Sequence, residues 1–366
     1  MTFSVLRPLL ACLFLTGVAT AGAADDGRPM DATQRHAAVD RLMSRYDGQV
    51  PGASLLVLRD GKPLLRRGYG EADREGKVRA TPATNYRLAS VSKQFTAASI
   101  LLLKQDGKLK LSDPVRKWIP ELPASDKAIT IRHLLTHTSG LIDYEDLIPD
   151  DRQKQLSDAD VLDLIASQHR LYFAPGSDYR YSNGGYVLLG LIVERVSGED
   201  LAAFMQQRIF QPLGMNHTLM YEHRDDQHIA HRAWGYSFLD GQWKRTDQSL
   251  TSATRGDGGI YSSIEDLARW DAAWYDDRLL DADSRRDAMR VHTPTDDPDV
   301  GYGYGWRITG DSLWHSGESQ GFRNVIVRWP KRHLTVIILT NRNDPKPYPL
   351  ALAIGELFGA YAGDRH

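Results

Sequence analysis

The chain has one cysteine among its 366 residues, and this residue, Cys12, lies in an apolar segment near the N-terminus. If that segment is removed on maturation, no disulfide bond can form in the remaining protein. A chain of this length buries enough apolar surface to fold without such cross-links. Stabilisation must therefore come from a conventional hydrophobic core.

An excess of charge of one sign is also missing. The chain has 45 Lys and Arg against 47 Asp and Glu, which gives a formal net charge of −2. No basic run interleaved with aromatic residues is present, so nothing suggests binding to nucleic acid or to an anionic membrane. Repeats, low-complexity tracts and long linkers are absent as well. With 42% hydrophobic and 25% charged residues, the composition is that of an ordinary globular protein.

Long hydrophobic runs are scarce, and the most prominent one, Leu9 to Val18, is too short to span a bilayer. Arg7 precedes it and Ala21-Gly22-Ala23 follows it, which is typical of a secretory signal peptide with a small-residue cleavage site. We therefore expect residues 1–24 to be removed and the protein to be secreted or periplasmic, without stable membrane insertion. The apolar run continues past Cys12, so lipid attachment at this cysteine is not expected.

Strand patterns gather at the two ends of the chain, and helical patterns fill the middle. Residues 53–58 and 63–69 flank a turn at Asp60-Gly61, and two apolar strands, 322–329 and 334–339, lie near the C-terminus. Strands from both ends with helices between them predict an α/β fold with two lobes. One antiparallel sheet with flanking helices would be built from both chain ends, and a mainly helical subdomain would be inserted.

A single domain, residues 25–366, accommodates this pattern. Its sheet lobe would comprise about residues 31–95 and 300–366, and its helical lobe about residues 105–295. Helical spacing recurs in the middle of the chain, at residues 158–167, 185–196, 201–209 and 264–274.

The most informative stretch is Ala89 to Thr96, the start of a predicted helix that ends at Asp106-Gly107. Ser90 and Lys93 are three residues apart, so they share one helix face and the amine can reach the hydroxyl. A serine needs a base to attack a carbonyl near neutral pH, and a deprotonated lysine can serve as that base. A chain of this composition contains about one Ser-x-x-Lys sequence by chance. Other motifs must therefore support a catalytic role for this one.

Two further stretches fit a serine–lysine hydrolase. Tyr181-Ser182-Asn183 follows a Pro-Gly turn, and it offers a phenol that can relay protons and an amide that can hold a peptide carbonyl. His315-Ser316-Gly317 ends a predicted strand. An imidazole there can donate to a leaving group, and the glycine lets a substrate backbone approach the strand edge. Three such motifs in this order indicate one catalytic site.

With these motifs, the chain resembles the penicillin-recognising serine hydrolase superfamily, which includes class C β-lactamases, D,D-peptidases and related esterases. The resemblance implies a β-lactamase/transpeptidase-like fold, in agreement with the two predicted lobes. It extends from about Val50 to Leu357 and includes, besides the three motifs, Leu134–Leu141, Gly184–Tyr186, Pro212–Met215, Gly258–Ser263 and Asp266–Trp270.

The resemblance implies roles for the first two motifs. Ser90 would be the acylated nucleophile, and Lys93 would be its general base. Tyr181 would carry protons during acylation and deacylation, and Asn183 would hold the substrate amide.

In the third motif, His315 would be a catalytic residue, and Ser316 and Gly317 would bind substrate. The oxyanion hole would consist of the backbone N–H groups of Ser90 and Glu318. No cofactor and no metal are implied, since side chains and backbone donors fill every role. The implied partner is a small-molecule or peptide substrate with an amide or ester bond, which includes cell-wall peptides.

His315 is the main departure from β-lactamases, which usually carry lysine at this place. A lysine holds a fixed charge that attracts a substrate carboxylate, whereas histidine is largely neutral at pH 7. We therefore expect uncharged acyl substrates such as short esters to be accepted and β-lactams to be hydrolysed slowly or not at all. Two roles stay open for His315: a charge that titrates near about pH 6 to 7, or a neutral ring that orients Tyr181.

The resulting prediction is an exported serine hydrolase with an acyl-enzyme at Ser90, of the D,D-peptidase, D-amino-acid peptide or esterase type. A class C-like β-lactamase and a penicillin-binding sensor without turnover are the alternatives. Specificity is expected from the loops around residues 143–151 and 221–242, because loops carry most of the variation in such sites.

Other candidate sites in the sequence are weaker. Gly317–Gly321 matches a nucleophile elbow centred on Ser319, but too few residues follow for the acid and histidine of that fold. His137 has small hydroxylic neighbours and is expected to brace a loop, and Gly301–Trp306 is expected to form a strand and a cleft wall. A polar surface loop, rather than a metal site, is expected for His223, His228 and His231.

Overall fold

The computed structural model describes residues 30–223 and 227–361. The expected signal peptide, residues 1–24 with Cys12, lies outside the described residues. In the part of the chain that the structure does describe, no helix is both long and apolar enough to cross a membrane.

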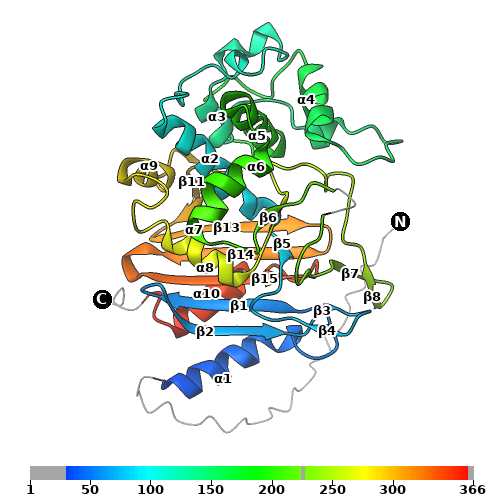
Figure 1. The fold of residues 1–366 in the computed structure, drawn as a ribbon, viewed down its shortest axis with the longest axis vertical. Coiled ribbons are helices and arrows are strands. Elements are labelled where there is room, and N and C mark those ends of the chain that lie inside the picture. The colour runs from blue at the N-terminus through cyan, green and yellow to red at the C-terminus, as the bar shows by residue number, and fades with distance from the viewer. Residues whose placement is uncertain (1–29, 224–226, 362–366) are drawn as a thin grey trace, which may run out of the picture.

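An eight-stranded antiparallel sheet with the order β10-β11-β12-β13-β14-β15-β1-β2 forms the centre of the molecule. Strands β1 (Ala53–Arg59) and β15 (Leu334–Thr340) pair along their whole length. The two chain ends therefore build one sheet, which confirms the sequence prediction (Figure 1). The other strands are β2 (Lys62–Tyr69), β10 (Thr293–Pro294), β11 (Gly301–Tyr302), β12 (Arg307–Thr309), β13 (Ser312–Ser319) and β14 (Phe322–Trp329).

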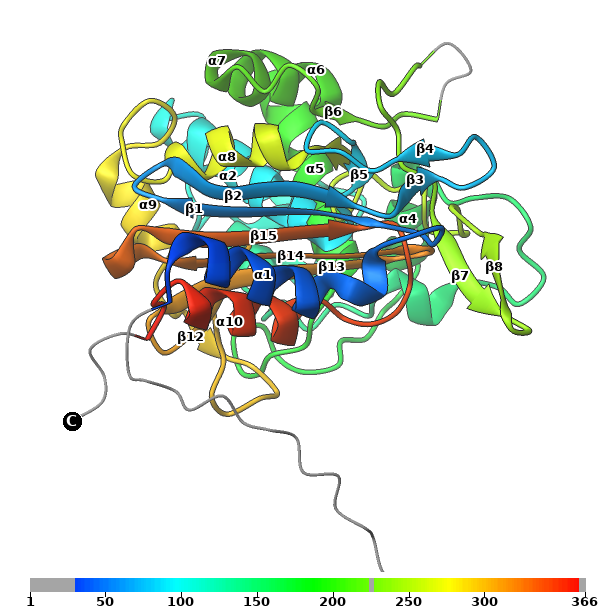
Figure 2. The same cartoon turned by 90° about the horizontal axis from the view of Figure 1, so that it is seen from below.

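The central strands β1, β14 and β15 are buried along nearly their whole length because both faces of the sheet are covered. In β1, Leu55 and Val57 belong to one hydrophobic cluster, whereas Leu56 and Leu58 belong to the other. Successive side chains of a strand point to opposite faces, so a continuous apolar run fills both clusters. Figure 2 shows α1 (Ala32–Met43) and α10 (Tyr348–Leu357) on one face, with α2 (Lys93–Gln105) and α8 (Ile264–Ala272) on the other.

The second lobe is mainly helical and lies above the sheet in Figure 1. Its central helix, α5 (Asn183–Ser197), packs against α2 and against three helices of the lobe. These are α3 (Ile131–Leu135), α4 (Asp158–Ala166) and α6 (Leu201–Met205). Helices predicted around residues 158–167, 185–196 and 264–274 are observed as α4, α5 and α8.

Several short elements had not been predicted from the sequence. A small sheet with the order β5-β9-β6 joins the two lobes beside α2, and a hairpin of β7 and β8 lies near the end of β13. These strands and the remaining elements are β3 (Glu71–Asp73), β4 (Val78–Arg79), β5 (Tyr86–Arg87), β6 (Leu219–Met220), β7 (Tyr236–Leu239), β8 (Gln242–Arg245), β9 (Ile260–Ser262), α7 (Gln211–Leu213) and α9 (Ala282–Ala288).

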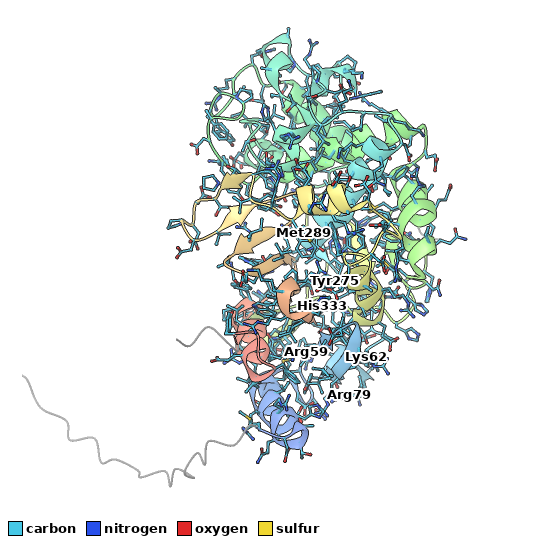
Figure 3. All side chains as sticks on the ribbon, turned by 90° about the vertical axis from the view of Figure 1, so that its left-hand side faces the viewer. Arg59, Lys62, Arg79, Tyr275, Met289 and His333 are labelled. Carbon is cyan, nitrogen blue, oxygen red and sulfur yellow. The ribbon has the colours of Figure 1, made fainter. Side chains whose placement is uncertain are left out.

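A buried ion pair fastens α8 to the sheet. Arg328 on β14 donates to the carboxylate of Asp271 on α8, and the two side chains are 1% and 3% exposed. The Thr335 hydroxyl donates to the same carboxylate oxygen over 2.8 Å. The guanidinium also covers the ring of Tyr275, which stacks on His333 at this end of the sheet (Figure 3). Each charge is therefore compensated although water is excluded.

Replacing Asp271 with Ala should lower the free energy of unfolding by about 3–5 kcal/mol, because Arg328 is left buried without its anion. Denaturant unfolding followed by circular dichroism measures the loss. The matched control is Glu265→Ala on the same helix, which breaks a pair with Arg66 whose side chains are 32% and 53% exposed. An exposed pair contributes at most about 1 kcal/mol. Equal losses in the two variants would contradict the assignment.

Candidate active site

Ser90 lies in a 3-10 turn, Ala89–Ser92, that leads directly into α2. Ala89 has a φ of 50°, a left-handed conformation that a non-glycine residue adopts only when its surroundings impose it. Just before it, the Leu88 N–H donates to the carbonyl of Ile260 on β9 over 2.8 Å. The nucleophile thus lies on a strained turn that the small sheet anchors.

Lys93 is fully buried, and its Nζ has three hydrogen-bond partners. It lies 3.0 Å from Ser90 Oγ, 2.7 Å from Asn183 Oδ1 and 3.0 Å from the backbone oxygen of Asp257. The last two atoms can only accept, so they fix two N–H bonds of the amine, whereas a hydroxyl can accept or donate. A deprotonated Lys93 therefore points its lone pair at the Ser90 hydroxyl, as a general base must.

Tyr181 lies close to two basic side chains. Its ring centre is 4.9 Å from Lys93 Nζ and 5.5 Å from Arg307 Cζ. The ring of His137 packs against it at 4.3 Å between centroids, and His137 Nδ1 accepts a hydrogen bond from the Ser182 backbone over 3.1 Å. His137 therefore braces the loop that carries Tyr181, which confirms that prediction.

Asn183 connects Lys93 to a carboxyl group that the motifs had not revealed. Its Nδ2 donates to Glu145 Oε1 over 3.1 Å, while its Oδ1 accepts from Lys93. Loss of hydration within the surrounding protein, and then repulsion from Asp143 and Asp257, raise the pKa of Glu145 to about 7. The loop that carries Glu145 was expected to shape specificity, but no motif singled out this residue. Its connection to Asn183 places it in the site.

A pocket of about 100 Å³ opens beside the nucleophile. Ser90 and Asn183 line it together with Glu145 and Glu318, and its other walls are mostly hydroxyl and carboxyl side chains of residues 249–258. It is a polar pocket with more acidic than basic groups. A larger cavity of about 730 Å³ lies between α9 and the β12–β13 turn and contains none of the motif residues.

The third motif lies on β13, beside the nucleophile turn. Gly317 is required there because a Cβ at this position would lie 2.0 Å from the carbonyl oxygen of Leu88. The close neighbour of this glycine is thus the protein's own turn, and its role toward a substrate backbone stays a prediction. Glu318 comes next and pairs through its side chain with Arg323 and Lys346. The oxyanion-hole role of its backbone N–H, with that of Ser90, stays a prediction.

His315 is buried, and both of its ring nitrogens have protein partners. Nδ1 lies 2.6 Å from the Ser316 carbonyl oxygen and so carries the proton, and Nε2 accepts from the Tyr302 hydroxyl at 3.0 Å. Burial, then the positive charges of Arg307 and Lys93, lower the pKa of His315 well below its usual value. Of the two roles left open for His315, this direction favours the neutral ring over a charge that titrates near about pH 6 to 7.

The weaker candidates acquire no catalytic partners. In the described part of the chain, the Ser319 hydroxyl is buried without a hydrogen-bond partner, so it has no base. His223, which had been considered as a metal ligand, has its Nε2 2.7 Å from the Ser252 carbonyl oxygen. Across residues 30–223 and 227–361, no cluster of three or more potential metal ligands occurs. Gly301-Tyr302 forms β11 as expected, although Tyr302 is fully buried and supports His315.

The sequence is similar to that of known proteins over most of its length. Residues 35–358 match the family model described as "Beta-lactamase". The chain is 32% identical over 317 residues to "Penicillin-binding protein 4*" of Bacillus subtilis, which covers 82% of this chain and 70% of that protein. Staphylococcal relatives that it also matches are longer, and the chain spans only 60% to 63% of their length.

Two solved structures are similar over nearly all of their own length. The penicillin-binding protein from Bacillus halodurans has a TM-score of 0.77 and 30% identity, which covers 87% of this chain and 99% of that one. The D-amino acid amidase from Ochrobactrum anthropi SV3 has a TM-score of 0.76 and 26% identity, which covers 91% and 99%.

The first test of the site concerns the nucleophile. Ser90→Ala should abolish covalent labelling by a fluorophosphonate, because it removes the hydroxyl that lies 3.0 Å from the buried Lys93 amine. Ser319→Ala, the matched control, should retain labelling. Intact-mass spectrometry reads out the adduct in both variants. Labelling that survives in the first variant and disappears in the second would overturn the assignment.

The second test concerns the contact between β13 and the nucleophile turn. Gly317→Ala must push β13 away from Leu88, and a shift near 1 Å should slow labelling of Ser90 by about 100-fold. Gly258→Ala is the control, because its Cβ would meet Ala89 at an ordinary 3.6 Å on the same turn. Labelling rates under matched conditions provide the comparison. Unchanged labelling in Gly317→Ala would show that the contact does not position Ser90.

Proposed function

Since the chain belongs to the beta-lactamase family, whose fold is that of serine hydrolases, we propose that it is an exported hydrolase that cleaves amide or ester bonds through an acyl-enzyme at Ser90. The observation that carries the proposal is the 3.0 Å contact between Ser90 Oγ and the buried Lys93 amine. Export rests on the signal-like residues 1–24.

Acylation follows from this arrangement. Lys93 takes the hydroxyl proton, and Ser90 Oγ attacks the substrate carbonyl carbon to form a tetrahedral oxyanion. The backbone N–H groups of Ser90 and Glu318 would stabilise that oxyanion. As the bond to the leaving group breaks, the Tyr181 phenol supplies a proton to the departing amine or alkoxide and regains one from Lys93. The acyl group is then an ester of Ser90.

Deacylation uses the same groups in reverse. A water molecule gives a proton to the base formed by Tyr181 and Lys93 and attacks the ester carbonyl. Ser90 Oγ leaves and recovers its proton, so the enzyme returns to its starting state. Every step uses side chains or backbone donors of this chain, and the overall reaction consumes one water for each bond cleaved.

The substrates we propose are peptides, amides or esters of D-amino acids, with cell-wall peptides among them, rather than β-lactams. Three observations support this class: His315 is neutral, the pocket beside Ser90 is polar, and Glu145 lies at its wall. A carboxylate there favours an acyl part that carries an ammonium group or hydrogen-bond donors. The structural likeness to a D-amino acid amidase points in the same direction.

Intact-mass spectrometry after exposure to three probes tests the proposal and its alternatives. A p-nitrophenyl ester and D-phenylalanine amide should be turned over, with Ser90 found free after the reaction. A penicillin should leave an adduct that persists for longer than either turnover. Rapid hydrolysis of penicillins at neutral pH would instead favour the class C-like β-lactamase, and stable adducts with all three probes would favour a sensor without turnover.

A further inference from the structure

Arg255 joins three helices of the second lobe through one side chain. Its Nε lies 2.8 Å from Asp158 Oδ2 on α4, and its Nη2 lies 2.8 Å from Glu194 Oε1 on α5. Its Nη1 lies 2.7 Å from Oδ2 of Asp200, the N-cap of α6. The Arg255 backbone N–H also donates to Asp158 Oδ1 over 3.0 Å. Both the side chain and the backbone of this residue are therefore fixed to the lobe.

These contacts lie largely out of water, which makes them hard to replace. The Arg255 side chain is 19% exposed, and that of Asp158 is 5% exposed. Burial raises the pKa of Asp158 to about 6 even with the guanidinium beside it. Without Arg255 the three carboxylates would repel one another, and Asp158 would be buried without its cation. The position of residue 255 thus depends on charge as well as on packing.

The next two residues bond to a different helix, α2. The Gly256 carbonyl oxygen accepts from the Thr96 hydroxyl over 2.6 Å, and the Asp257 carbonyl oxygen accepts from Lys93 Nζ over 3.0 Å. Thr96 and Lys93 are three residues apart, so they lie on one face of α2. Residues 255–257 therefore connect the carboxylates of the helical lobe to the catalytic base in a single short segment.

This segment lies directly against α5 and has no room to move toward it. A Cβ at Gly256 would lie 2.4 Å from the Tyr186 carbonyl oxygen and 3.3 Å from Cα of Gly190, both on α5. The segment is thus held by contact with α5, by hydrogen bonds to α2 and by the Arg255 side chain at its start. A change at Arg255 should therefore be transmitted to the Asp257 carbonyl, two residues further on.

The Asp257 carbonyl controls the orientation of the base. Lys93 has two partners that can only accept, the Asp257 carbonyl oxygen and Asn183 Oδ1. Each takes one N–H of a deprotonated amine, and the lone pair is left for the Ser90 hydroxyl. If the carbonyl moves away, the amine can rotate, and its lone pair faces Ser90 for only part of the time.

We propose that Arg255 is a positioning residue for acylation: it holds the Asp257 carbonyl at Lys93 and so keeps the lone pair of the base directed at Ser90. The proposal rests on the proposed function and names a residue outside the three motifs that the same site requires. Arg255 is not one of the residues that line the pocket beside Ser90. Its loss should therefore slow the chemical step more than it weakens substrate binding.

The burst of p-nitrophenol from a p-nitrophenyl ester separates these two effects. Its dependence on ester concentration gives the acylation rate constant and the dissociation constant independently. Arg255→Gln should lower the acylation rate constant by about 10- to 100-fold, as expected for a displacement approaching about 1 Å, and change the dissociation constant little. Arg255→Lys keeps the charge but cannot reach all three carboxylates, so it should restore part of the rate.

Asp271→Ala is the matched control for stability. It also breaks a buried ion pair, but this pair joins Asp271 to Arg328 and fastens α8 to the sheet. At a temperature where circular dichroism shows both variants to be folded, Asp271→Ala should keep the wild-type acylation rate constant. Equal losses in Asp271→Ala and Arg255→Gln would overturn the proposal, since the effect would then be one of stability.

Two smaller changes decide the question if Arg255→Gln does not fold. Asp158→Asn keeps the shape of the buried partner but removes its charge, and it should also lower the acylation rate constant. Asp200→Asn alters a partner whose side chain is 47% exposed, so its effect should be smaller.

The reverse order of these two effects, or a wild-type acylation rate constant in Asp158→Asn or in folded Arg255→Gln, would overturn the proposal. A change confined to the dissociation constant would do the same, because Arg255 would then act on binding. A wild-type enzyme that gives neither a burst nor a labelled Ser90 is a separate result, which overturns the proposed function and this inference together.

Discussion

The close approach between β13 and the backbone before Ser90 is the constraint on which the rest of the site depends. Gly317 leaves no space for a side chain against the Leu88 carbonyl, and Asn324 on β14 donates to the carbonyl of Arg87 over 2.7 Å. Two neighbouring strands therefore hold the same short stretch of backbone. Because Lys93 lies one helical turn beyond Ser90, the position of the base follows from that of the nucleophile.

Much of the fold could be predicted because its main elements carry their own patterns. β14 and β15 are apolar runs, and α4, α5 and α8 repeat with helical spacing, so each can be identified without its neighbours. β5 and β9 are two and three residues long, which is too short for a period. Their pairing is decided by the tertiary structure. They could be found only after the two lobes were placed.

Some residues of the site could likewise be predicted from the sequence, and others could not. Ser90 and Lys93 are adjacent on one turn, so their spacing alone indicates the chemistry. Glu145 and Arg307 belong to a loop and a strand far apart in the sequence, and nothing local distinguishes them from solvated charges. For His315 the residue type is misleading rather than uninformative, because a histidine suggests titration near neutral pH. Burial beside Arg307 and Lys93 lowers the pKa of the ring, and the burial of a residue cannot be predicted from a three-residue motif.

The pairing of β1 with β15 determines when the protein can become active during its synthesis. β1 is made early, yet the strand that covers its inner edge, Leu334–Thr340, follows only after the whole helical lobe. β13 and β14, which hold the Ser90 turn, also come late. A nascent chain therefore carries its nucleophile long before it has the scaffold that orients it. Contacts between such distant segments form slowly, so the oriented nucleophile is a late product of folding.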